Sequence, residues 1–385
     1  MKKSMMPDAY IGREQAYIKH TILRTYLQRM FLIVGRSKEL VINYVDCFAG
    51  PWKEEDDRLG DTSIGISLER MDSCQKYLEE KFSRKVKFRA LYIEKSPESF
   101  EKLQAFLKNN PYPDIEVRCL KGNYTDIIDE IIDWCGSYFT FFFVDPTGWQ
   151  KVVGAITMQN LLKLEKAEFL INLMYDFINR FIALEKHSED MIEIFGEVPV
   201  FSDETPEQRQ NNLLALYRKN MNNYFEGRTA FVPINKPGNK RILYYLVYFT
   251  RHSRGIEVFK TEAQKMNIVQ RITQQEYKLR KQLGQAETMD MFGSDLDVFP
   301  DNHEYSDNKY AAKKYLMEKL STEPMLIDID RWASFLEDSD FYPIDYQMAI
   351  KELVDEGRVK NIDADVSRRT KHLINPDKRE RWILV

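Results

Sequence analysis

The chain has 385 residues, of which 43% are hydrophobic and 13% aromatic, enough for one large core and a smaller second one. Its formal net charge of −4 excludes a global basic field that would draw polyanions, so any such attraction must come from a local patch. No stretch approaches the roughly 18 apolar residues that a membrane span needs, and the first residues lack the apolar run of a signal peptide, so we expect a cytoplasmic protein with no membrane partner.

The cysteines and histidines predict no metal centre. The four cysteines, Cys47, Cys74, Cys119 and Cys135, are scattered and form no CxxC pair. The five histidines are equally dispersed, so the spacing of a zinc site is missing. We expect reduced and mostly buried thiols.

The first part of the chain alternates helical and strand-like segments. Apolar side chains recur at helical spacing over residues 13–34, which predicts an amphipathic helix. Short apolar runs that predict strands follow at 41–46, 88–93, 115–120, 138–144 and 168–174, with helices between them at 63–82, 97–108, 124–136 and 154–165. This alternation is typical of a parallel sheet covered by helices on both faces.

The pattern changes after Met174. Residues 176–226 are charged and helical, which indicates an insertion. Two further strands, 229–233 and 242–250, are joined by turn-forming residues and predict an antiparallel pair at the end of the sheet. A long polar helix at 256–283 completes a first domain, 1–283, and the acidic, glycine-containing stretch 284–307 is the predicted linker.

The remaining residues, 308–385, predict a small second domain. Helices at 308–320, 330–337 and 343–356, a short strand at 325–328 and two last strands at 358–362 and 381–385 are the elements of a winged helix-turn-helix. Its predicted core includes Trp332, Leu353, Val354 and Trp382.

Four of the predicted strands end in residues suited to a ligand. In open α/β sheets the ligand lies beyond the carboxyl ends of the strands, near the point where strand order reverses. An acid after the first strand could pair with the amino-acid end of a cofactor, an acid after the second could accept both ribose hydroxyls, and an amide after the third could contact adenine. The residues in question are Asp46, Phe48, Ala49 and Gly50, then Glu94, then Gly122 and Asn123, and finally Asp145 and Pro146.

These motifs resemble a known family. Asp46–Pro51, Tyr92–Glu94 and the run Asp145-Pro146-Thr147-Gly148-Trp149 are similar to the three-Cys-motif partner proteins, which themselves resemble class I methyltransferases. The resemblance covers most of residues 10–285 and implies a Rossmann-like sheet, parallel with an antiparallel last strand, that binds S-adenosylmethionine. It also implies a separate three-Cys-motif protein as partner.

The opening helix carries a second part of this resemblance. Lys19-His20 is also found early in the related large-subunit rRNA adenine-amine methyltransferases, which implies roles for Lys19 and His20 at the cofactor or the target; packing of the helix edge on the sheet explains them equally well. Trp52 departs from the glycine that many relatives have after Gly50. The GxGxxG fingerprint is absent, which favours S-adenosylmethionine over a dinucleotide.

The Asp-Pro pair indicates the reaction. Amino-group methyltransferases commonly carry Asp-Pro-Pro-aromatic at this strand end, where the carboxylate and the proline-fixed backbone carbonyl accept the N–H groups of an exocyclic amine. Asp145 and Pro146 match this pattern and are the predicted catalytic residues. Trp149 stands one position late; it could stack on a flipped base or lie in the core.

The last domain carries a basic segment. Arg368, Arg369 and Lys371 could contact phosphates as part of a basic wing, whereas the helix at 343–356 is acidic and suits a polyanion poorly. Three interpretations therefore stay open. The first is an S-adenosylmethionine-dependent N-methyltransferase of a nucleic-acid base; the second is a methyltransferase of a protein, peptide or small molecule; the third is a non-catalytic partner protein that keeps the fold.

Overall fold

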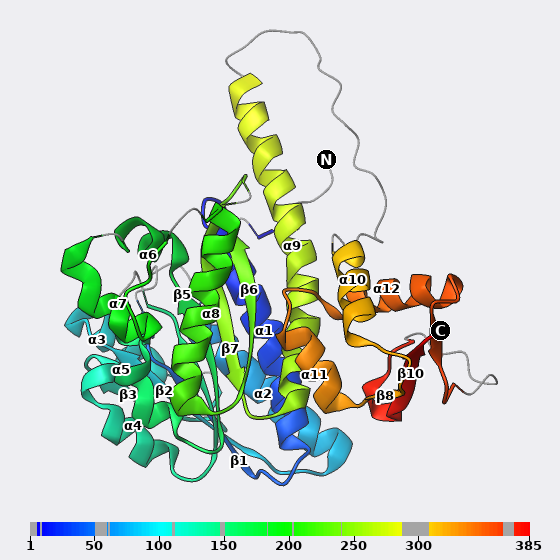
Figure 1. Cartoon of the computed structure of the whole chain (residues 1–385). Coiled ribbons are helices and arrows are strands. Elements are labelled where there is room, and N and C mark those ends of the chain that lie inside the picture. The colour runs from blue at the N-terminus through cyan, green and yellow to red at the C-terminus, as the bar shows by residue number, and fades with distance from the viewer. Residues whose placement is uncertain are drawn as a thin grey trace. The chain divides into compact units, whose positions relative to one another are not determined.

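The structure is a computed structural model that describes residues 6–7, 10–50, 60, 62–109, 112–146, 151–182, 184–201, 204–239, 241–286, 308–364 and 373–385. The chain divides into two compact units, one of residues 6–258 and the other of residues 259–385 (Figure 1). This division lies within the long helix α9 (Ser253–Ala286), whereas the predicted first domain kept that helix whole. Most of the predicted linker lies outside the described residues.

A seven-stranded sheet forms the centre of the first unit (Figure 1). Its order is β3-β2-β1-β4-β5-β7-β6. The strands are β1 (Val41–Asp46), β2 (Lys87–Glu94), β3 (Glu116–Lys121), β4 (Phe139–Val144), β5 (Ala167–Leu173), β6 (Arg228–Asn235) and β7 (Ile242–Thr250). The first five strands pair in parallel, and β7 is antiparallel to both β5 and β6. This arrangement is consistent with the predicted Rossmann-like methyltransferase fold, and the predicted antiparallel end of the sheet is confirmed.

Burial explains which strands occupy the middle. Every residue of β4 and β5 is buried, and so is all of β1 after Val41, because helices cover both faces of these strands. The edge strand β3 is mostly exposed or half-buried. The longest apolar runs of the sequence therefore form the centre of the sheet.

Two sets of helices cover the sheet. On one face lie α1 (Glu14–Gly35) and α2 (Ser63–Phe82): the ring of Tyr26 lies 5.6 Å from that of Phe141, and Phe31 lies 5.0 Å from Phe88. The opposite face packs into one apolar cluster with α4 (Ile128–Cys135), α5 (Ala155–Leu162), α7 (Ser188–Phe195) and α8 (Pro206–Phe225). The remaining helix of the parallel part, α3 (Pro97–Lys108), contacts β2 and β3.

The predicted helical insertion is present between β5 and β6. It consists of α6 (Tyr175–Phe181), a short 3-10 turn, α7 and α8. Thr205 and Gln208 form a capping box at the start of α8, which fixes where that helix begins.

The second unit contains the predicted order of small elements after α9. These are α10 (Lys309–Lys319), β8 (Met325–Ile327), α11 (Ile329–Glu337), α12 (Pro343–Asp355), β9 (Val359–Asn361) and β10 (Glu380–Leu384), with the strands in the antiparallel order β8-β10-β9. Trp332, Leu353 and Trp382 are buried as predicted. Val354 is 37% exposed, which corrects the predicted core: it directly follows Leu353 on α12, so it points about 100° away from the buried face.

Candidate active site

The order of the strands places the predicted site residues at one edge of the sheet. Strand order reverses between β1 and β4, so the carboxyl ends of these strands flank the crevice where open α/β sheets bind ligands. Side chains alternate between the two faces of a strand. Val45 and Ile93 belong to the apolar cluster on the α5 side, so Asp46 and Glu94 face α1 and α2.

Asp46 is a fully buried carboxyl group at the end of β1. Its Oδ1 accepts a hydrogen bond from the backbone N–H of Phe48 at 3.1 Å. Burial raises the pKa of Asp46 to about 6, against the opposing effects of hydrogen bonds from Ser63 and Phe48; nearby Asp145 raises it further. A cationic amino group bound here would restore the charged form of Asp46.

The backbone after Asp46 follows the neighbouring strands. Cys47 donates its N–H to the carbonyl of Phe143 on β4 at 3.0 Å, and Ala49 donates to Ile93 on β2 at 2.8 Å. The ring of Phe48 packs edge-on against Tyr124 at 5.5 Å. The predicted loop residues are thus held at the switch point up to Gly50, and Trp52 lies outside the described residues.

Glu94 closes β2 with a carboxylate that is 7% exposed. Its Oε1 accepts the N–H of Ser96 at 2.6 Å, a bond that fixes the carboxylate at the start of α3. The backbone carbonyl of Glu94 accepts the N–H of Gly122 at 3.0 Å, which ties the ends of β2 and β3 together. Gly122 has φ +149°, a conformation that L side chains rarely adopt.

Asn123 lies on the surface. Its Nδ2 donates to Asp126 at 3.0 Å. The amide keeps a second N–H and its carbonyl oxygen for another partner, and its predicted contact with adenine stays a prediction.

Asp145 is the centre of the site. Lys19 of α1 forms an ion pair with its Oδ2, and both side chains are largely buried, 15% exposed for Lys19 and 18% for Asp145. Asn172 of β5 donates its Nδ2 to the Asp145 Oδ1 at 2.7 Å. A carboxylate offers about four lone-pair sites, so Asp145 can still accept a further N–H. Pro146, which follows, is buried.

Asn172 was missed by the sequence analysis. It interrupts the otherwise apolar strand Phe169–Leu173, and an amide within such a run is the signal that could have identified it. Its side chain is 3% exposed, and its Oδ1 has no hydrogen-bond partner among the described residues. A buried acceptor without a donor is costly, and this one lies beside Asp145.

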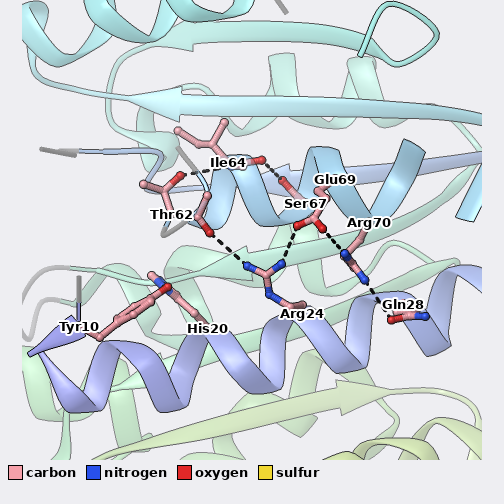
Figure 2. A network of polar contacts seen from close by, with 11 residues as sticks. Tyr10, His20, Arg24, Gln28, Thr62, Ile64, Ser67, Glu69 and Arg70 are labelled. Atoms are coloured by element: carbon pink, nitrogen blue, oxygen red, sulfur yellow. Dashed lines mark hydrogen bonds and ion pairs between the residues drawn. The ribbon is translucent and has the colours of Figure 1, made fainter. Parts of the chain in front are cut away.

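Lys19 and His20 are adjacent in sequence but have different surroundings. Lys19 contacts Asp145, whereas Nδ1 of His20 lies 3.1 Å from the Tyr10 hydroxyl (Figure 2). Burial lowers the pKa of His20 well below its usual value, and the positive charges of Lys19, Arg13 and Arg24 lower it further. His20 is therefore neutral at pH 7 and can offer a hydrogen bond but no charge.

A polar network holds this part of α1 against α2. Arg24 donates to the Glu69 carboxylate at 2.6 Å and to the carbonyl of Gly60 at 3.1 Å, and Arg70 links Glu69 to Gln28 (Figure 2). The helix that carries Lys19 is thus fixed in rotation, which directs Lys19 to the strand ends.

Several predicted site residues lie outside the described residues: Trp149, Arg368, Arg369 and Lys371. Within the described part of the chain, no group of three or more His, Cys, Asp or Glu side chains is placed to hold a metal ion. In the same residues, no helix combines the length and apolarity of a membrane span. Cys47, Cys74 and Cys135 are buried free thiols, as predicted.

Among the comparisons with known proteins, those with solved structures give matches. No family model matches the chain, and no curated protein does. A crystal structure of a protein from Thermobifida fusca YX, described as a "putative methyltransferase", superposes with a TM-score of 0.30 and 9% identity, covering 60% of this chain and 80% of that one. Because this superposition is loose, the fold rests on strand order, and the resemblance to three-Cys-motif partner proteins stays a prediction.

Proposed function

We propose that this chain is an S-adenosylmethionine-dependent N-methyltransferase whose target is an exocyclic amine of a nucleic-acid base. The observation that carries the proposal is the set of polar groups around Asp145 at the switch point of the sheet. Lys19 and Asn172 hold the carboxylate in place, and the orphaned Oδ1 of Asn172 adds a buried acceptor beside it. Two acceptors close together suit the two N–H groups of an amine.

The same edge suits the cofactor. Asp46 would accept the ammonium group of S-adenosylmethionine, and Glu94 would accept its ribose hydroxyls. The cofactor supplies an activated methyl group on its sulfonium. The protein has to hold amine and sulfonium in line, and such positioning alone contributes several orders of magnitude to the rate.

The residues at Asp145 would act by hydrogen bonding. The lone pair of an exocyclic amine is delocalised into the ring of the base. When a carboxylate and a carbonyl accept its two N–H bonds, the nitrogen becomes pyramidal and its lone pair turns toward the methyl group. Asp145, with the carbonyl of Pro146 or the Oδ1 of Asn172, would supply these acceptors, and Lys19 would hold the carboxylate in position.

We also propose that the second unit is a winged helix, from its order of elements and its small antiparallel sheet. The basic residues Arg368, Arg369 and Lys371 would contact phosphates there. The acidic sequence of α12 keeps a second candidate open, in which the wing docks on a protein such as a three-Cys-motif partner. In that case the methylated amine belongs to a protein, peptide or small molecule, or the chain is non-catalytic.

The test uses labelled S-adenosylmethionine with tRNA, rRNA, DNA and a cell lysate as acceptors. Wild type should label a nucleic acid. Asp145→Asn and Asp145→Ala should lose at least about a hundredfold in rate, since a preorganised hydrogen-bonding group in an active site is worth about that much. Asp72→Asn is the matched control, because Asp72 is a carboxylate of α2 that is 15% exposed and pairs with Lys76; it should leave the rate unchanged.

Affinity for S-adenosylhomocysteine and the melting temperature should change little in Asp145→Asn. If that variant no longer binds the cofactor or unfolds, Asp145 has a structural role, and the non-catalytic interpretation becomes better supported. If wild type labels only the protein fraction of the lysate, the second candidate replaces the first.

A further inference from the structure

A basic cluster lies at the same edge of the sheet, outside the residues assigned so far. Arg180 and Asp176 belong to α6, which directly follows β5; Lys236 and Arg241 belong to the turn that joins β6 and β7. The Asp176 carboxylate binds all three cations, with Arg180 at 2.5 Å, Lys236 at 2.9 Å and Arg241 at 2.5 Å. Three positive charges around one negative charge leave the cluster with a net charge of +2.

The shape of this cluster differs from that of an ordinary surface ion pair. The Asp176 side chain is only 3% exposed, whereas Arg180 is 50% and Arg241 54% exposed. The carboxylate therefore lies beneath the cations and holds them, while the guanidinium groups reach solvent. Each guanidinium has five N–H donors and commits few of them to Asp176, so donors remain for another acceptor. Holding the side chains in advance lowers the entropy cost of binding an anion.

A further cation lies close by. Arg209, in the first turns of α8, is near enough to affect the titration of Tyr175, as Arg241 does. Its guanidinium stacks on Phe201 at 4.1 Å, and its buried Nε has no hydrogen-bond partner among the described residues. Positive charge thus extends from the β6–β7 turn to α8.

The cluster is near the proposed reaction centre. Asp176 lies four positions after Asn172, which binds Asp145, so the Cα atoms of Asn172 and Asp176 lie at most about 14 Å apart. On the other side, Tyr244 follows Arg241 closely, and its pKa is raised by burial and by the charge of Asp145. An anion at the cluster would therefore lie at the same edge of the sheet as Asp145.

We propose that Arg180, Lys236 and Arg241 bind backbone phosphates of a nucleic-acid strand whose base is presented to Asp145. Enzymes that act on a base turn it out of its stack and also contact the flanking nucleotides. Arginine forks match phosphate oxygens in a bidentate manner. The proposal rests on the proposed nucleic-acid substrate. It assigns the binding of the strand's backbone to residues of the first unit itself.

The test measures the binding of a single-stranded RNA and a single-stranded DNA oligonucleotide by fluorescence anisotropy over a salt series, with the full chain. Each lost phosphate contact reduces the slope of log affinity against log salt by about 0.7 on single strands, so R180A/R241A should flatten it by about 1.4. R180K/R241K keeps both charges and should retain most of the slope.

The matched control removes two equally exposed cations at the opposite edge of the sheet. Lys87 and Lys166 are 57% and 53% exposed, stand at the amino ends of β2 and β5, and are paired with Glu116 and Glu39. K87A/K166A should leave the salt slope as it is in wild type. Affinity for S-adenosylhomocysteine should be unchanged in all three variants, which shows that the cofactor site is intact.

Three results would overturn the inference. The first is a wild-type salt slope in R180A/R241A. The second is a lowered melting temperature in that variant with unchanged strand binding, which would mean that the cluster only stabilises the β6–β7 turn. The third is binding of inorganic phosphate without binding of either oligonucleotide. If wild type binds the strand through this cluster but does not bind S-adenosylhomocysteine, the proposed function is rejected. The inference that the cluster binds backbone phosphates then still holds.

Discussion

Asp46 places a carboxyl group where water cannot reach it. Its pKa in the folded chain is about 6, above its ordinary value of 3.8, so the folded state holds a proton that the unfolded chain releases. The stability that Asp46 contributes is therefore complete below about pH 4 and is lost as the pH rises to about 6. By linkage, this loss is about 3 kcal/mol at pH 7.

Asp46→Asn should remove this pH dependence. Without a bound cofactor, the variant should unfold at higher denaturant concentration than wild type at pH 8, and the difference should shrink toward pH 4. Its affinity for S-adenosylhomocysteine should be weaker at pH 8, because the carboxylate partner of the ammonium group is lost. Denaturant titrations at several pH values measure the first effect and calorimetry the second. A variant less stable than wild type at pH 8 would contradict this account of Asp46.

At this scale the sequence predicts residues that stand at strand ends and fails for residues whose partners are remote. Asp46, Glu94 and Asp145 could be found because each ends an apolar run. The cluster around Asp176 could not, because Lys236 and Arg241 come from a turn far along the chain. Lys19 and His20 were both predicted to act at the cofactor or the target, and that role of His20 stays a prediction. A helix turns neighbouring side chains about 100° apart, so the two have different surroundings in the structure.

At the scale of elements, a buried carboxyl group joins α1, β5 and β7. Glu168 is 5% exposed; it accepts hydrogen bonds from the Tyr26 hydroxyl at 2.9 Å and from the Thr250 hydroxyl at 2.7 Å. The hydroxyl of Tyr248 lies 2.6 Å from that of Tyr26 and completes the group. This network fixes the register of α1 on the sheet and hence the position of Lys19.

Glu168→Ala should lower the free energy of unfolding by roughly 2–5 kcal/mol, because buried hydroxyl donors lose their acceptor. Urea titration measures the loss. Glu165→Ala, an exposed change in the preceding loop, should stay within about 0.5 kcal/mol of wild type. An equally small effect of Glu168→Ala would mean that the network does not hold α1.

The strands of the centre were predictable as elements because burial on both faces demands unbroken apolar runs. The ends of the elements were less predictable. The helix predicted at 154–165 is Ala155–Leu162, and the one predicted at 124–136 begins with a 3-10 turn before α4. Helix ends depend on the local backbone conformation of one or two residues, which the periodicity of apolar side chains does not predict.

At the scale of the whole molecule, the division at 258/259 was not evident from the sequence. The helix α9 reads as one continuous polar helix, but its contacts belong to two units. Within the second unit, Lys260 donates to the carbonyl of Ser339 at 2.9 Å and Gln264 accepts the N–H of Ile344 at 3.0 Å. Such long-range bonds leave no periodic signal, so composition alone placed the boundary after the helix.

The proposed function depends on the binding of S-adenosylmethionine at the carboxyl ends of the strands. Calorimetry with S-adenosylhomocysteine tests this binding most directly. Wild type should bind, and Glu94→Ala should bind about ten- to a hundredfold more weakly, because hydrogen bonds to a charged group contribute roughly 1.5–3 kcal/mol. Glu98→Ala, at an 82% exposed position a few residues on, is the control and should bind as wild type does. Absence of binding in wild type, or unchanged affinity in Glu94→Ala, would contradict the account.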